Sequence, residues 1–227
     1  MHPIQRHILK VLTVIGEMRY RDLKPKEIDG NQFMYHLGVV IKKGYVKKVG
    51  ILYLLTTDGK MYADRAEFDT FIPRIQPKIV TMICCVNRKN ETLLFKRTRS
   101  PVSNLVHLPY GKIHMGEPVK EAANRELKEK SGLEASLTHI GDIYVRVYDG
   151  DELIANILHH VFIGKNPTGE ILEKTVAGIP FWSKIEDVPK KELIGGFKEI
   201  IEIIEKNKSK FFFEEFDLHL PKLNPQT

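Results

Sequence analysis

The helical pattern of residues 117–131 restricts the fold of this chain more than any other feature. Pro118 favours a helix start and Gly132 a helix end. Each helical residue turns by about 100° around the axis, which places four apolar residues on one side: Val119, Ala122, Ala123 and Leu127. Glu126 falls inside this apolar arc and Glu129 at its edge. Because burying an unpaired carboxylate is costly, Glu126 needs a cation beside it.

Two kinds of cation would satisfy Glu126. The first is a divalent metal, because Glu126 and Glu129 are three residues apart and can reach one ion or neighbouring ions, and Mg²⁺ commonly bridges such carboxylates to phosphates. The second is Lys130, which follows Glu126 by four residues in the favourable order for a helical ion pair. These residues alone leave both alternatives open.

The segment GKIHMGEPVKEAANRELKEKSGL resembles the Nudix box. That pattern is Gly, five residues, Glu, seven residues, Arg-Glu-aliphatic, one residue, Glu-Glu, one residue and Gly-aliphatic. The matching positions are Gly111, Glu117, Arg125, Glu126, Leu127, Glu129, Gly132 and Leu133. The one clear departure is Lys130, which stands where the family has the second glutamate of the pair. So many spaced matches are far more specific than a lone glycine motif.

The resemblance implies an α/β/α sandwich with a mixed sheet, and hydrolysis of a nucleoside diphosphate linked to another group, with Mg²⁺ or Mn²⁺ as cofactor. It implies that Glu126, Glu129 and the backbone carbonyl of Gly111 bind the metal. It also implies that Glu117 and Arg125 form a salt bridge that stabilises the loop–helix arrangement. The catalytic set expected from the box is therefore Glu126, Glu129, Arg125 and Glu117. The substrate and the base that activates water stay open.

Lys130 bears directly on whether hydrolysis is retained. A lysine adds positive charge where the box would bind a cation, so it either weakens catalysis or contacts a substrate phosphate itself. Arg97 and Arg99 follow a strand and are further candidates for phosphate contacts, with a solvated strand end as the alternative. We therefore expect the substrate-binding residues to be Arg97, Arg99 and Lys130.

The sequence predicts two domains, residues 1–66 and 78–227, joined by a linker at 67–77 that contains two prolines. Strands are expected in the second domain at 79–86, 92–95, 136–148, 153–163 and 181–182, and helices at 117–131 and 197–204. Strands with helices packed around them indicate an α+β or α/β class.

The first domain resembles a winged helix-turn-helix, with a helix, a short helix, a third helix and a hairpin in that order. We expect Phe33, Leu37, Val40 and Ile41 of the third helix to face the core. Residues 1–75 carry a net charge of +5 out of +6 for the chain, which favours double-stranded DNA as a partner over a protein-docking or dimerising role. The expected DNA contacts are Gln32, Tyr35, His36, Lys42, Lys43, Lys47 and Lys48.

The remaining features indicate a cytoplasmic protein without a membrane segment. The N-terminus has no apolar signal core, and the longest apolar run is far shorter than the roughly 20 residues of a spanning helix. Cys84 and Cys85 are adjacent, so we expect them on opposite faces of a strand and not bonded to each other. Two functions follow: a Nudix-type hydrolase with a DNA- or partner-binding winged helix, or a transcriptional regulator whose Nudix domain senses a nucleotide-like metabolite. A homodimer stays open.

Overall fold

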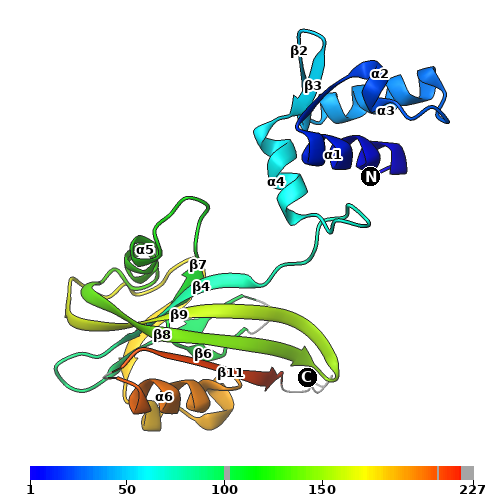
Figure 1. Cartoon of the computed structure of the whole chain (residues 1–227). Helices are drawn as coiled ribbons and strands as arrows, with labels where there is room; N and C mark the ends of the chain where they lie inside the picture. Colours follow the sequence, from blue (N-terminus) through cyan, green and yellow to red (C-terminus); the bar gives the residue numbers. More distant parts are fainter. Residues whose placement is uncertain (100–102, 209, 221–227) are drawn as a thin grey trace. The chain divides into compact units, whose positions relative to one another are not determined.

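The computed structural model of the chain describes residues 1–99, 103–208 and 210–220. Its backbone separates into two units, Met1–Ile75 and Gln76–Thr227 (Figure 1). Within the part of the chain that the structure describes, no helix is long and apolar enough to cross a membrane.

The first unit is made of helices and one small antiparallel sheet. Its elements are α1 (Pro3–Ile15), β1 (Glu17–Arg19), α2 (Tyr20–Leu23), α3 (Gly30–Lys42), β2 (Val46–Val49), β3 (Leu52–Leu55) and α4 (Thr57–Arg65). The three strands pair in the order β1-β3-β2. Asp29 caps α3, because its carboxylate accepts hydrogen bonds from the backbone N–H groups of Asn31 and Gln32.

The buried face of α3 differs from our expectation at two positions. Phe33, Leu37 and Val40 are buried as predicted, but Ile41 is 38% exposed. His36 is buried instead: its ring stacks on His2 at 3.9 Å and its Nδ1 lies 3.2 Å from Nε2 of Gln5. Positions 33, 36, 37 and 40 form the regular helical stripe. Inside it the imidazole stacks on His2, the N-cap of α1, and has the amide of Gln5 as its polar partner. His36 is therefore not an outward contact.

The segment that we expected to be a linker packs partly onto the first unit. Phe71 is 2% exposed and belongs to the core that contains Phe33 and Leu37. Tyr62 of α4 meets its ring at 6.1 Å. Burial of the apolar side chain of Phe71 thus packs this proline-containing stretch against the core of the first unit.

The second unit is built on a five-stranded mixed sheet. Its order is β11-β8-β9-β4-β7, formed by Phe212–His219, Glu134–Asp149, Glu152–Thr168, Lys78–Cys85 and Tyr110–Lys112. β11–β8 and β4–β9 pair in parallel, and the other neighbours are antiparallel. A smaller antiparallel sheet has the order β10-β5-β6, formed by Gly178–Ser183, Thr92–Arg97 and Val106–His107.

Two helices cover opposite faces of the five-stranded sheet (Figure 1). α5 (Val119–Ser131) packs on the face that carries Ile83 and Cys85, and α6 (Phe197–Lys206) on the face that carries Met82 and Cys84. The unit is an α/β/α sandwich with a mixed sheet, as predicted. Both cysteines are free and buried, since their side chains alternate between the two faces.

Strand β11 was not predicted from the sequence. Only its first and seventh residues, Phe212 and Leu218, are buried, because it is an edge strand whose outward positions meet solvent. Its pattern therefore lacks the strict alternation that identifies a half-buried strand. The two long predicted strands are correct in kind and extend to β8 and β9, joined at Gly150 with φ 60°.

Candidate functional site

Helix α5 turns the glutamate-rich segment so that one carboxylate is buried and another is not. The helix starts after Pro118 and ends at Gly132, whose φ of 78° lies in the left-handed region that glycine favours. Leu127 is 1% exposed against the sheet. The side chain of Glu126, on the same side, is 8% exposed, whereas that of Glu129 is 59% exposed. Glu126 therefore lies inward, as the helical spacing predicts.

Arg125 ties the loop before α5 to the helix. Its Nε and Nη2 donate to the two carboxylate oxygens of Glu117 at 2.7 and 2.9 Å, and Nη2 also donates to the backbone carbonyl of Lys112 at 3.0 Å. Its Nη1 donates to Glu126 at 2.7 Å and to Glu129 at 3.3 Å. Hydrogen bonding from Arg125 lowers the pKa of Glu117 to about 2, so the bidentate pair stays ionised.

Lys130 is a second cation beside Glu126. Its Nζ lies 3.5 Å from Oε2 of Glu126 and 5.3 Å from the ring centroid of Phe95. Because Arg125 contacts Oε1, each oxygen of Glu126 faces a positive charge. The side chain of Lys130 is only 19% exposed, so it is held in place rather than extended into solvent. The four-residue ion pair that the sequence permits is thus present.

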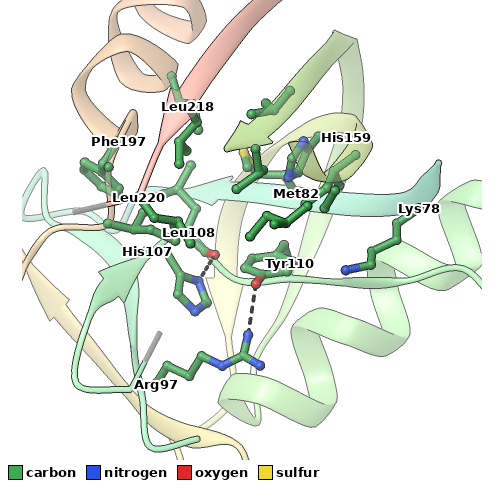
Figure 2. Close-up of a pocket in the computed structure, with 18 residues that line it drawn as sticks. Lys78, Met82, Arg97, His107, Leu108, Tyr110, His159, Phe197, Leu218 and Leu220 are labelled. Atoms are coloured by element: carbon green, nitrogen blue, oxygen red, sulfur yellow. Dashed lines mark hydrogen bonds between the residues drawn. The ribbon is translucent and has the colours of Figure 1, made fainter. Parts of the chain in front are cut away.

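Two cavities share part of their lining, and the second of them lies against helix α5. The first, which we call the apolar cavity, has a volume of about 390 Å³ and is lined mainly by side chains such as Met82, Leu108 and Phe197 (Figure 2). The second, which we call the basic pocket, has a volume of about 320 Å³, and its charged lining residues are Arg97, Arg99, Lys112, Lys130 and Glu126. Three residues line both: Arg97, His107 and Tyr110. An uncharged ring system and an attached anion would therefore fit side by side.

The shared wall is held by specific hydrogen bonds. Nη1 of Arg97 donates to the hydroxyl of Tyr110 at 3.0 Å (Figure 2). Nδ1 of His107 lies 2.6 Å from the carbonyl of Leu108, so this nitrogen carries the proton and donates. His107 Nε2 is buried and has no hydrogen-bond partner among the described residues. The neutral imidazole thus keeps an unpaired acceptor buried within the wall that the two cavities share.

The structure brings together most of the expected site residues of the second domain. Arg97, Arg99 and Lys130 line the basic pocket with Gly111 and Glu126. Glu117 and Arg125 form an ion pair with each other. Glu129 is exposed to solvent and pairs with Arg125. Lys112 and Tyr110 were missed by the sequence analysis. The strand that carries them, β7, has only three residues, which is too short to show an alternating pattern in the sequence.

A model of the NUDIX domain matches residues 76–202, more than half of the chain. This chain belongs to the Nudix family. Over 149 residues it is 23% identical to the uncharacterized Nudix hydrolase YvcI of Bacillus subtilis, covering 63% of this chain and 92% of that protein. Over 59 residues it is 36% identical to the ADP-ribose pyrophosphatase of Methanocaldococcus jannaschii, covering 26% of this chain and 35% of that enzyme.

Solved structures show the same Nudix fold. The MutT protein of Bacillus halodurans superposes with a TM-score of 0.53 and 21% identity, covering 65% of this chain and 93% of that one. The Nudix domain of Shewanella oneidensis NrtR, solved with ADP ribose, gives a TM-score of 0.50 and 14% identity, covering 60% and 91%. The relatives that are hydrolases support a hydrolase-family domain in this chain.

Nudix enzymes generally use divalent metals, and the Nudix box of this chain departs from the family pattern at Lys130. Gly111 lies directly against Glu126, because a Cβ on Gly111 would stand 1.8 Å from the carboxyl carbon. This close approach suits a shared ligand site. The charge of Lys130 does not: a divalent ion beside Glu126 would meet the ammonium group of Lys130, which lies 3.5 Å from Oε2 of that carboxylate. The residues present therefore do not fit the Mg²⁺ or Mn²⁺ ion that the box implies.

Acidification is expected to destabilise this Nudix domain. Burial lowers the pKa of His107 and of His159 to about 4, below the ordinary value of 6.5. Between these values the unfolded chain binds more protons than the folded one, so the free energy of unfolding falls as the pH drops through this window. The loss is on the order of 3 kcal/mol per histidine. Urea unfolding followed by the fluorescence of Trp182, the single tryptophan, measures it. His107→Gln should flatten the pH dependence, and an unchanged dependence would contradict this origin.

Proposed function

We propose that the Nudix domain binds a nucleoside diphosphate linked to another group without efficient hydrolysis, and that the first unit binds DNA, so that the chain acts as a ligand-responsive regulator. The observation that carries this proposal is the position of Lys130. Its ammonium group pairs with Glu126 and lines the basic pocket. A fixed cation at that point replaces the positive charge of a metal and serves as a contact for a phosphate.

The two cavities support this class of ligand. The basic pocket is lined by four cationic side chains and one carboxylate, a balance that favours a diphosphate. The adjoining apolar cavity offers a surface for a ring system. ADP-ribose is the first compound to test, because the 36% identical relative is named an ADP-ribose pyrophosphatase.

A pyrophosphohydrolase is the second candidate function. The relatives named as hydrolases favour it, and so does the clamp between Glu117 and Arg125, which holds the loop and helix of the box together. In that function Glu126, Glu129 and Gly111 would act as the metal ligands, and Lys130 would have to leave Glu126. The two candidate functions involve the same class of ligand and differ in whether that ligand is hydrolysed.

For the first unit we propose a winged helix-turn-helix in which α3 enters the major groove of double-stranded DNA. Gln32 and Tyr35 are exposed on α3, with Tyr35 68% exposed, and such side chains can read base edges. Four lysines are exposed at the end of α3 and on strand β2 of the hairpin, where they would contact phosphates: Lys42, Lys43, Lys47 and Lys48.

Isothermal titration calorimetry of the wild-type chain with ADP-ribose, in the absence of a divalent metal, tests whether this ligand binds. We expect binding that Arg99→Ala weakens by roughly tenfold or more, because a charge-assisted hydrogen bond to phosphate is lost. Lys165→Ala is the matched control, since Lys165 is exposed and lines neither cavity. If no compound in a panel of nucleoside diphosphates binds at millimolar concentration, the proposal is wrong.

A further inference from the structure

A bulge in β8 places three ligand-type side chains on one face of the sheet, away from both cavities. The pairing of β8 with β9 shifts register between His139 and Gly141. In a regular strand, residues three apart face opposite sides, but the extra residue of a bulge brings His139 and Asp142 to the same side. His160 lies directly opposite Asp142 on β9. The three side chains therefore form one cluster.

The donor atoms of this cluster converge. Nε2 of His139 and Nδ1 of His160 lie 2.8 and 2.7 Å from the same oxygen, Oδ1 of Asp142. All three atoms lie within 4.8 Å of one another, and no other group of three His, Cys, Asp or Glu side chains in the described residues does so. Two imidazole nitrogens that converge on one carboxylate oxygen form a set of ligand atoms, with a three-way hydrogen-bond network as the alternative.

We propose that His139, Asp142 and His160 bind a divalent metal ion of the zinc type. Imidazole and carboxylate suit Zn²⁺ and neighbouring transition metals, whereas Mg²⁺ prefers oxygen ligands throughout. Three protein ligands leave a coordination position for water, as in open zinc sites. The side chains are 33%, 20% and 18% exposed, so an ion from solvent can reach them.

The surroundings of the cluster support a bound ion. The ring of His139 stacks on Phe162 at 5.0 Å and meets the edge of Phe211 at 5.3 Å, and these contacts hold the imidazole in its orientation. Thr81 pairs with His160 in the neighbouring strand. Its hydroxyl is fully buried and has no hydrogen-bond partner among the residues described.

This site is distinct from the basic pocket but lies on the same face of the sheet. Across neighbouring strands His160 pairs with Thr81, and Thr81 pairs with Gly111, which lies against Glu126. At about 4.8 Å between strands, the Cα atoms of His160 and Gly111 lie about 10 Å apart. None of the three proposed ligands lines either cavity. The proposal therefore does not depend on the ligand proposed above.

Calorimetric titration of the untagged, metal-free chain with Zn²⁺ tests the site. We expect one ion per chain, with the dissociation constant raised at least about tenfold in His139→Asn and in His160→Asn, because each loses a ligand. His7→Ala is the matched control for unspecific binding to histidine, since His7 is exposed on α1. Its affinity should equal that of the wild-type chain.

The visible spectrum of Co²⁺ bound to the wild-type chain gives a second measurement that needs no variant. Ligand-field bands of a nitrogen- and oxygen-coordinated ion are expected, and Zn²⁺ should displace them. Circular dichroism of each variant checks that its fold is kept. Absence of Zn²⁺ binding by the wild-type chain, or equal affinity in folded His139→Asn and His160→Asn, would show that the cluster is only a hydrogen-bond network.

Discussion

Lys130→Glu is expected to give the chain a Mg²⁺-dependent hydrolysis of nucleoside diphosphates at least about a hundredfold faster than that of the wild type. The substitution removes the ammonium group that lies 3.5 Å from Oε2 of Glu126 and adds a carboxylate one helical turn further on. Two carboxylates then face the position beside Gly111 in place of an ion pair. Release of phosphate-containing products from a panel of nucleoside diphosphates, with Mg²⁺ or Mn²⁺, measures the effect.

Two further variants separate the local effect from overall charge. Lys130→Gln removes the cation without adding a ligand, so it should gain little activity. Lys128→Glu makes the same change of charge on the same helix, but Lys128 is 55% exposed and pairs with Glu134 outside the basic pocket. It should behave as the wild type. Wild-type turnover equal to that of Lys130→Glu would reject the regulator and favour the hydrolase.

Replacing Lys42, Lys43, Lys47 and Lys48 with glutamine is expected to abolish most DNA binding at physiological salt. Each phosphate contact releases condensed counterions, so the loss of four contacts should reduce the slope of log K against log salt by roughly 3 to 4 units. Fluorescence anisotropy with labelled duplex DNA between 50 and 200 mM salt measures this slope. These four side chains are exposed in the structure, so their replacement should leave the fold intact.

A matched control carries the same loss of charge elsewhere on the first unit. It replaces four exposed cations outside the end of α3 and the hairpin: Lys26, Lys60, Arg65 and Arg74. If DNA binding depends only on net charge, both variants lose affinity alike, and the proposed winged-helix geometry is wrong. If the wild-type chain shows no salt-dependent DNA affinity, the first unit serves another partner.

Most of the Nudix domain was predictable because its pattern is local. Helical spacing alone placed Glu126 on the buried side of α5, and the order of Glu126 and Lys130 permitted their ion pair. The turn at Gly150 between two alternating segments indicated the long hairpin β8–β9. Each of these features depends on residues a few positions apart, where backbone geometry fixes which side chains meet.

Other features could not be read from local patterns. His36 follows the helical stripe of α3, yet its burial depends on the stacking of His2 and the amide of Gln5 from another helix. Strand β11 exists because β8 offers it a parallel partner. The spacing of α3 permits the burial of His36, but the partners that make it favourable lie in another segment, and those that form β11 do so as well.

The sequence by itself determined the Nudix box from Gly111 to Leu133, its helix and the inward turn of Glu126. Only the tertiary structure decided what surrounds that carboxylate. Strand pairing brings Arg97 and Tyr110 from different parts of the chain to one wall, and the β8 bulge sets His139 beside Asp142. The physical reason is that helical geometry fixes which nearby residues have neighbouring side chains. In a sheet, the neighbouring side chains depend on which strands pair and in which register, and those strands can be far apart in the sequence.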